Sequence, residues 1–258
     1  MKIKAVVDAL EKFAPLPLQE DYDNAGLQCG LTESKCSGAL LCLDVTEDAI
    51  QYAHERGLNL IVSHHPLLFR GLKRIADEAY VERCVRRAIQ FDITLYAAHT
   101  NLDNAPGGVC HEMARRLGME HVEFLAPSRD GEGGSGVIGD IPPMEAMELL
   151  RRVKSVFGAG CLMHNAGPAR PVGRVALCGG AGEFLIDTAL RRGADLYLTG
   201  EIGYHRFFGY EGRMWLAAIG HFESERFTPC LMERILTQAL PELPVEVYAK
   251  PTTPIRFL

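Results

Sequence analysis

The stretch ALLCLDVTEDAIQYAHERGLNLIVSHH, residues 39–65, contains two short apolar runs separated by a segment with helical character. Short apolar runs bounded by turn residues are typical of strands buried in a parallel sheet. The segment between them ends at Gly57, a residue that favours the left-handed end of a helix. The stretch therefore predicts a strand–helix–strand unit with its two strands parallel.

A second stretch repeats this pattern, RVALCGGAGEFLIDTALRRGADLYLTGE at residues 174–201. Aligned without a gap, Leu41-Cys42 falls on Leu177-Cys178, and Arg56-Gly57 falls on Arg192-Gly193. Strand–helix–strand units all resemble one another, so chance similarity is the alternative explanation. Polar residues recur after the strands of both stretches, and this favours an internal duplication.

A third apolar run follows in each half, ITLYAAHTNLD and MWLAAIGHFESE, and each continues into a histidine followed four residues later by a carboxylate. The pattern predicts an α/β fold of two similar α/β/α halves with a metal site between them. We place the halves at residues 1–127 and 128–258, because the glycine-rich stretch 128–136 is the best candidate for a seam. Helices are expected at Tyr80–Gln90 and Pro229–Leu240, and residues 244–254 resemble a strand and a proline-stiffened tail that can pack back on the first half.

Composition excludes several classes of protein. The formal net charge of −6 argues against non-specific nucleic-acid binding, which requires a basic surface. The N-terminal segment has helical apolar spacing interrupted by charges, unlike a secretory signal, and no apolar run is long enough to span a membrane. The eight cysteines contain no CxxC pair, so we expect reduced core thiols and no structural zinc knuckle. These features predict a cytoplasmic protein.

Candidate metal ligands follow the predicted strands at four points. They are His64-His65, His99 with Asp103, Glu201, and His221 with Glu225. In parallel sheets, ligands bind beyond the carboxyl ends of the strands. Each pair alone is equally consistent with ordinary surface or core residues. Together they supply more nitrogen and oxygen ligands than one tetrahedral zinc needs, and this favours two adjacent cations that activate a water molecule.

Other motifs carry weaker signals. Arg70, Lys73 and Arg74 follow the His64-His65 turn and could clamp a substrate phosphate, although basic loop residues are usually only solvated. The CGGAGE loop at residues 178–183 lacks both nucleotide-loop spacings, so a tight packed turn is the simpler interpretation. Asp23 or Asn24, in the turn-rich stretch 21–30, could line a site.

The motifs DNAGLQCG, VSHHPLLF, HTNLD, LTGE and GHFESE, in this order, resemble those of the NIF-like dinuclear metal-binding family. The resemblance covers nearly the whole chain. It implies that His64 and His65 bind different ions, that Asp103 binds one ion and His221 the other, and that Glu225 bridges them. It also implies that His99 lines the site, and that the assembly is a ring-shaped homohexamer.

Members of this family are often described as GTP cyclohydrolase 1 type 2 homologs. The resemblance therefore implies hydrolytic opening of the guanine imidazole ring of GTP with release of formate, and His99 or Glu225 could shuttle protons. The cofactors would be two divalent metal ions drawn from zinc, manganese, iron, nickel and magnesium. The alternatives are a metal-dependent phosphoesterase or nucleotidase, and a metal-binding interaction protein without turnover, because all three need the same ligands.

Overall fold

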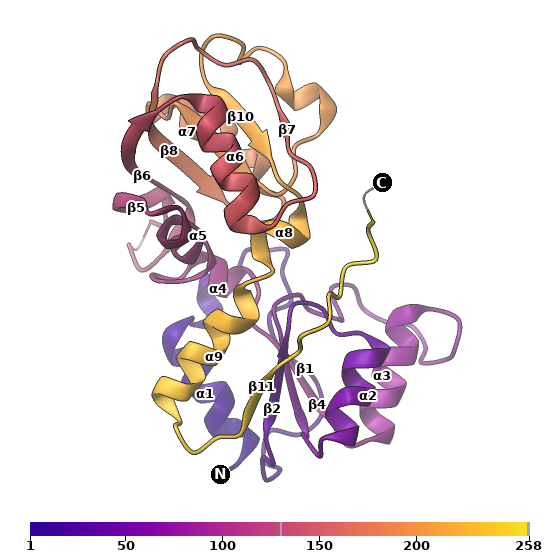
Figure 1. Ribbon diagram of the computed structural model, residues 1–258. Coiled ribbons are helices and arrows are strands. Elements are labelled where there is room, and N and C mark those ends of the chain that lie inside the picture. The colour runs from indigo at the N-terminus through magenta and orange to yellow at the C-terminus, as the bar shows by residue number, and fades with distance from the viewer. Residues whose placement is uncertain (130, 257–258) are drawn as a thin grey trace. The chain divides into compact units, whose positions relative to one another are not determined.

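The computed structural model describes residues 1–129 and 131–256, and the chain forms two compact units. Unit 1 comprises Met1–Leu102 and Phe227–Pro254, and unit 2 comprises Asp103–Arg226 together with the residues from Ile255 onward. Each unit is built on one mixed sheet with helices packed against it (Figure 1). The predicted α/β class with two sheet-containing parts is confirmed.

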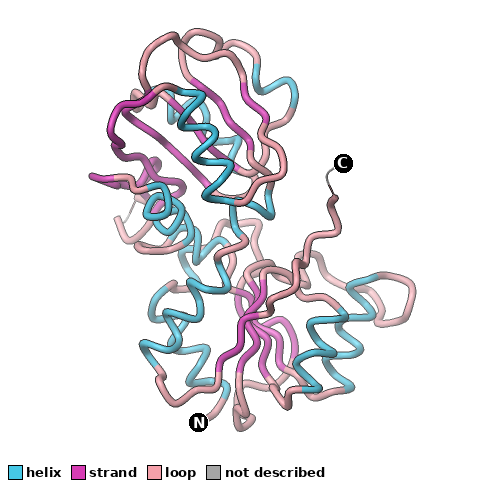
Figure 2. The backbone as a smooth tube through the Cα atoms, viewed as in Figure 1, coloured by secondary structure: helices cyan, strands magenta, loops and turns pink. Residues whose placement is uncertain are grey.

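Unit 1 has a five-stranded sheet in the order β1-β4-β3-β2-β11. Strands β4, β3, β2 and β11 are parallel, whereas β1 pairs antiparallel with β4 at the edge. Figure 2 shows the strands of unit 1 between two layers of helices, α1 with α9 on one side and α2 with α3 on the other. The strands are β1 (Gly26–Cys29), β2 (Ala39–Cys42), β3 (Leu60–Ser63), β4 (Thr94–Ala97) and β11 (Val245–Val247). The helices are α1 (Ile3–Phe13), η1 (Leu16–Leu18), α2 (Glu47–Glu55), α3 (Tyr80–Gln90) and α9 (Thr228–Ala239).

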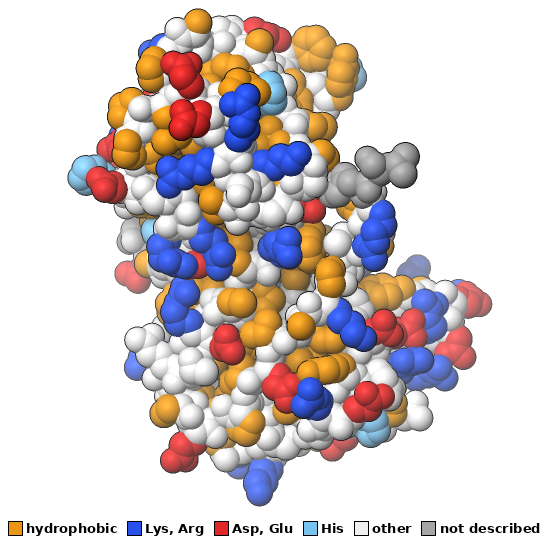
Figure 3. Space-filling view, in the orientation of Figure 1, with side chains coloured by type: hydrophobic (Ala, Val, Ile, Leu, Met, Phe, Trp, Pro, Cys, Tyr) orange, Lys and Arg blue, Asp and Glu red, His pale blue; other side chains and the backbone are white. Residues whose placement is uncertain are grey.

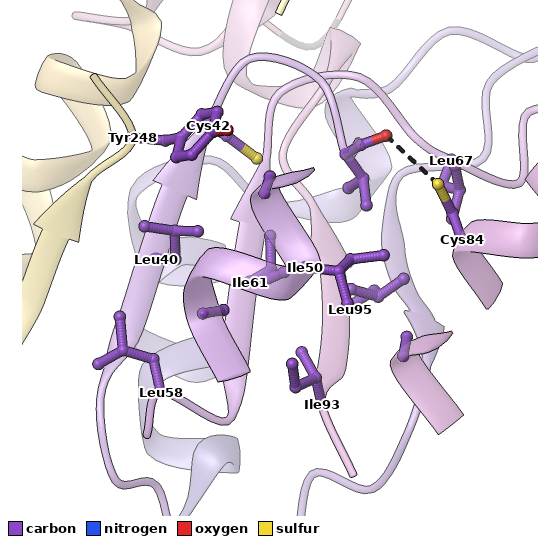
Figure 4. Packing of buried hydrophobic residues seen from close by; sticks show 14 of the residues in the cluster. Leu40, Cys42, Ile50, Leu58, Ile61, Leu67, Cys84, Ile93, Leu95 and Tyr248 are labelled. Carbon is purple, nitrogen blue, oxygen red and sulfur yellow. Dashed lines mark hydrogen bonds between the residues drawn. The ribbon is translucent and has the colours of Figure 1, made fainter. Parts of the chain in front are cut away.

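The core of unit 1 lies where α2 and α3 cover the sheet (Figure 4). Leu40, Ile61 and Leu95 come from three adjacent strands and face Ile50 of α2. These side chains are almost completely buried, and each contributes about 1.5–3 kcal/mol through removal from water. The apolar runs are continuous because both faces of the strands are covered by helices. This packing holds the carboxyl ends of the strands in fixed positions.

Unit 2 has a six-stranded sheet in the order β5-β6-β8-β9-β10-β7. Strands β8, β9 and β10 are parallel, and β6 and β7 flank them antiparallel. Helix α5 packs against β6 and β8. The strands are β5 (Glu120–Pro127), β6 (Gly134–Met144), β7 (Met163–His164), β8 (Val172–Cys178), β9 (Leu196–Thr199) and β10 (Trp215–Ala218). The helices are α4 (Thr100–Asn104), which contains the unit boundary, α5 (Val109–Leu117), α6 (Ala146–Phe157), η2 (Gly182–Leu185), α7 (Ile186–Arg191), η3 (Tyr204–Phe207) and α8 (His221–Glu225).

The strand registers agree with the repeat seen in the sequence. Cys42 pairs with Ser63 in unit 1, and Cys178 pairs with Thr199 in unit 2, as the gap-free alignment requires. In each unit the third parallel strand has a short antiparallel neighbour, β1 beside β4 and β7 beside β10. The helix ends also agree, because Gly57 and Gly193 have φ angles of 68° and 74°.

The compact units divide differently from the halves placed at residues 1–127 and 128–258. The glycine-rich stretch 128–136, whose Asp130 lies outside the described residues, joins β5 to β6 in a hairpin within unit 2. The division falls instead after Leu102, because β5 pairs with β6 and β6 pairs with β8. The segment Phe227–Pro254 belongs to unit 1, because β11 pairs with β2 and α9 packs on α1.

The cysteines are free thiols, but the expected core location fits only five of them. Cys161 and Cys230 are exposed, and Cys29, in the edge strand β1, is only partly buried although it packs against the core of unit 1. Among the described residues, no helix combines the length and the apolar character needed to cross a bilayer.

Candidate metal centre

In unit 1, the candidate ligands follow the carboxyl ends of β2, β3 and β4. Cys42, Ser63 and Ala97 are paired in one row across these strands. The ladder continues beyond the row, since the amides of His64 and His65 donate to the carbonyls of Cys42 and Leu43 at 3.1 and 3.0 Å. The backbone at the end of β3 is therefore anchored where its histidines begin.

Three histidine rings of unit 1 form one cluster. The ring centroids of His64 and His65 are 5.0 Å apart, and His99 lies 5.3 Å from His64 and 5.5 Å from His65. One ring nitrogen of each lies within 4.8 Å of the other two. His64 is fully buried, whereas the His65 and His99 side chains are partly exposed. Neighbouring imidazoles of this kind are typical of sites for divalent cations.

Each ring in the cluster has an oxygen acceptor at Nδ1. His64 Nδ1 lies 2.8 Å from the carbonyl oxygen of Ala98. His65 and His99 each lie 2.7 Å from a carboxylate, of Asp44 and Asp23 respectively. Because a carbonyl or ionised carboxylate only accepts, Nδ1 carries the proton in each ring. In the neutral form of each ring, Nε2 therefore keeps its lone pair, as a metal-binding histidine requires.

Asp23 is held by more than His99. The backbone amide of Thr100 donates to the other carboxylate oxygen at 3.1 Å, and the Thr100 hydroxyl donates to the same oxygen. Burial alone would raise the pKa of the Asp23 carboxyl, but the hydrogen bonds from His99 and Thr100 outweigh it and lower the pKa to about 2. Asp23 is consequently ionised at neutral pH and fixes the His99 ring.

Asp44 plays the same role for His65, and the sequence analysis missed it. Burial raises the pKa of Asp44, but the hydrogen bonds from His65 and Thr252 and the nearby histidine charges together outweigh this, so the net pKa is lowered. The Thr252 hydroxyl, from the tail after β11, also donates to Asp44. Asp44 follows β2 by two residues, so the strand-end rule that selected the histidines could have found it.

In unit 2, the candidate ligands lie beyond β8, β9 and β10. Cys178, Thr199 and Ala218 form the corresponding row of paired residues. His221, the first residue of α8, places Nδ1 3.1 Å from Glu201 and Nε2 3.2 Å from Glu225. Glu201 is thus a partner of His221, in agreement with its selection as a strand-end residue.

Glu225 is the buried carboxylate of this group, with 4% of its side chain exposed. One of its oxygens lies within 4.8 Å of an oxygen of Asp103, and its carboxylate also contacts His221. Both carboxylates raise the pKa of the buried Cys178 thiol, after the larger effects of its hydrogen bond with Cys110 and of burial. Glu225 is therefore the neighbour that Asp103 and His221 share within unit 2.

The histidine–carboxylate pairs of the two units are not equivalent positions. Ala97 and Ala218 occupy the same row of their sheets, which aligns His99 with Gly220 and His221 with Thr100. His221 therefore begins a helix, whereas His99 precedes one. This offset explains why His99 is held by a carboxylate from the N-terminal loop, while His221 contacts the carboxylate one helical turn ahead.

The candidate phosphate-binding residues Arg70, Lys73 and Arg74 lie on the exposed loop between β3 and α3. Arg74 forms an ion pair with Glu78 at 2.6 Å and approaches Glu82 at 3.7 Å. Within unit 1 the structure brings the three histidines together with Asp23 and Asp44. Among the interactions of the described residues, none joins Arg70, Lys73 or Arg74 to this cluster.

The loop after β8 passes against the ligands of unit 2, and this leads to a prediction for Gly180. A Cβ added there would lie 2.5 Å from Glu225 Oε1, and the residue has a φ of +57°. Gly193 has a φ of +74° with open space around it, so Gly193→Ala measures the backbone strain alone. We expect Gly193→Ala to lower the free energy of unfolding by about 1 kcal/mol, and Gly180→Ala by about 2 kcal/mol or more because of the added clash.

Denaturant unfolding of both variants in metal-free buffer checks this expectation. Equal losses for the two variants would show that the loop does not press on Glu225.

The chain thus has two similar α/β units whose strands end in histidines and carboxylates. These are the ligand types of divalent-metal sites, and they define the class of protein. The chain belongs to the Duf34/NIF3 (NGG1p interacting factor 3) family, whose model matches residues 1–254.

Its relatives include proteins named GTP cyclohydrolase 1 type 2 homolog. The protein of that name from Clostridium perfringens is 35% identical over 228 residues, covering 87% of each chain. The protein of that name from Clostridium acetobutylicum is 31% identical over 266 residues, covering 100% of this chain and 99% of the relative. Among solved structures, Staphylococcus aureus protein SA1388 shares the fold with a TM-score of 0.92 at 24% identity, over 100% of this chain and 99% of the other.

Proposed function

We propose that this protein is a dinuclear metal-dependent hydrolase whose ligands are His64, His65, Asp103, His221 and Glu225. His64 and His65 would bind different cations, Asp103 would bind one of them and His221 the other, and the Glu225 carboxylate would bridge the two. The donor set is mixed nitrogen and oxygen without thiolate, which suits zinc, manganese, iron, nickel or magnesium.

One observation carries the proposal. His64, His65, His99 and His221, from two different units, each direct Nδ1 to an oxygen acceptor of the same unit. Histidines that ligate metals almost always have their other ring nitrogen hydrogen-bonded in this way, because it fixes both the tautomer and the direction of the free lone pair. Nδ1 of His121 and of His164 also lies near an oxygen, but these two residues are exposed and stand apart from other histidines. The four candidate rings differ from them because they follow strand ends and lie beside one another or beside Glu225.

The bridging role rests on the surroundings of Glu225. Its carboxylate is buried and adjoins both Asp103 and His221 within unit 2. Two carboxylates this close, one buried and the other partly buried, repel each other unless a positive charge compensates. A bridging carboxylate is how a protein holds two cations at short separation.

The chemistry that follows is hydrolysis. A pair of divalent cations lowers the pKa of a water molecule and stabilises negative charge that develops in the substrate. In the chain itself, the Asp23 carboxylate holds the proton on His99 Nδ1, which leaves Nε2 as a proton acceptor beside His64 and His65. We assign to His99 the transfer of protons during the reaction, with Glu225 as the second candidate.

We propose GTP as the substrate, with opening of the guanine imidazole ring and release of formate. The names of the curated relatives support this choice. Arg70, Lys73 and Arg74 would contact the triphosphate. We further propose that the protein acts in the cytoplasm as a homohexamer.

Metal-loaded protein is expected to release formate from GTP, and His65→Ala is expected to abolish turnover. The variant removes the His65 imidazole, which is a proposed ligand and which Asp44 holds in position. Formate and inorganic phosphate are measured in the same reaction. The matched control is His54→Ala, which removes an exposed imidazole from α2 of the same unit and should leave the rate unchanged.

Other outcomes would redirect the assignment. Phosphate release without formate would indicate a phosphoesterase or nucleotidase. Metal binding without turnover of any nucleotide tested would indicate an interaction protein.

A further inference from the structure

Unit 2 contains a cavity of about 370 Å³ outside the group of candidate ligands. It is lined mainly by apolar and aromatic side chains, and the polar groups at its wall include an imidazole and a carboxylate. Figure 3 shows hydrophobic side chains gathered on unit 2 beside the segment between β9 and β10. The lining includes Met163, His164, Tyr204, Phe207, Phe208 and Glu211.

One side of the cavity lies beside the carboxyl end of β10, which His221 follows, whereas Asn165 and Ala166 line it toward the start of that strand. Met163 pairs with Ala218, the last residue of β10, and His221 follows three residues later. On the other wall, Tyr204 begins η3 three residues after Glu201, whose carboxylate contacts His221. Two walls of the cavity are thus continuous in the chain with the segments that carry and position His221.

The aromatic side chains of the wall are exposed to an unusual degree. Tyr204 is 74% exposed and Phe208 is 58% exposed, and their ring centroids lie 5.4 Å apart at an angle of 74°. Large apolar rings gathered at the surface mark a binding site, because their exposure is unfavourable until something covers them. Rings of this kind stack on the flat face of a nucleobase.

The carboxylate of Glu211, in the wall of the cavity, can distinguish one nucleobase from another. The Gly209 amide donates to Glu211 Oε2 at 2.8 Å, which orients the group. An ionised carboxylate only accepts hydrogen bonds. Guanine presents two adjacent N–H donors, at N1 and at its 2-amino group, whereas adenine presents an acceptor at N1. A carboxylate therefore favours guanine.

We infer that this cavity is the base-binding subsite of the protein, in which Phe208 stacks on a guanine ring, Tyr204 and Phe207 complete the aromatic wall and Glu211 accepts from the N–H edge of the base. The inference rests on the proposed function, because it supplies the base recognition that a GTP hydrolase requires. No cation takes part in this recognition, so nucleosides test it without the metal site.

The test uses the intrinsic fluorescence of Trp215, the single tryptophan of the chain, whose ring lies 5.8 Å from that of His164. Guanosine is titrated into the full-length protein with and without a chelator, and adenosine is titrated in parallel. We expect a saturable change with guanosine, weaker binding of adenosine, and about a tenfold rise in the guanosine dissociation constant in Phe208→Ala. Glu211→Gln should remove most of the preference for guanosine.

Phe184→Ala is the matched control, since Phe184 is a phenylalanine of the same unit that is also 58% exposed and lies outside the cavity. Tyr204→Ala replaces Phe208→Ala if the latter does not fold. No saturable change, or equal effects of Phe208→Ala and Phe184→Ala, would overturn the inference. A change in oligomeric state in Phe208→Ala without any nucleoside binding would also overturn it, in favour of a contact between copies of the chain.

Different results would contradict the proposed hydrolase activity and the proposed base-binding subsite. Guanosine binding without formate release from GTP would leave the subsite standing and remove the activity. Formate release with an unchanged KM for GTP in Phe208→Ala would support the activity and remove the subsite.

Discussion

Glu225→Gln is expected to lower the bound metal from about two divalent ions per chain to fewer than one, and to abolish metal-dependent hydrolysis. The substitution keeps the size of the side chain but removes the negative charge and one of the two acceptor oxygens. Glu225 would contact both cations, so its loss affects both, whereas His64→Ala should remove only one. Metal content is measured by elemental analysis after dialysis against a metal-replete buffer.

Glu223→Gln is the matched control for this experiment. Glu223 is a buried glutamate of the same helix, α8, whose carboxylate lies where a Cβ of Gly220 would point. Among the described residues it belongs to none of the groups of candidate ligands. We expect its metal content to equal that of the native protein. Full metal content in Glu225→Gln would remove the bridging role, and less than one ion per chain in the native protein would remove the two-ion site altogether.

Asp23→Asn is expected to lower the free energy of unfolding by about 2 kcal/mol at neutral pH. The pKa of Asp23 falls from 3.8 to about 2 on folding, and each unit corresponds to about 1.4 kcal/mol. Because the folded pKa is the lower one, the stabilisation is fully present above about pH 4 and is lost as the pH falls through 2. The gap between native protein and variant should therefore close between pH 4 and pH 2.

Denaturant unfolding across this pH range, in the presence of a chelator, measures the effect without a contribution from metal release. Asp21→Asn removes the same charge from an exposed neighbour, and its effect should stay within about 0.5 kcal/mol. A gap for Asp23→Asn that persists unchanged at pH 2 would show that the variant acts through packing rather than through the ionised carboxylate.

The sequence alone determined the repeated strand–helix–strand units and the positions of the histidines after the strands. The apolar runs at residues 39–42 and 60–63 and the helix ending before Gly57 follow from periodicity and from glycine's tolerance of positive φ, which are local properties. The alignment of Cys42 with Cys178 became a shared sheet register for the same reason. These features need no knowledge of distant contacts.

Only the tertiary structure decided where the compact units divide and which groups hold the histidines. The pairing of β11 with β2 joins segments about 200 residues apart, and nothing in either segment specifies its partner. The hydrogen bond between His99 and Asp23 spans 76 residues, and the one between Thr252 and Asp44 spans 208. Such contacts depend on which strand ends meet when the sheet is assembled, because apolar periodicity fixes the face that a residue occupies but not the neighbour that it meets there.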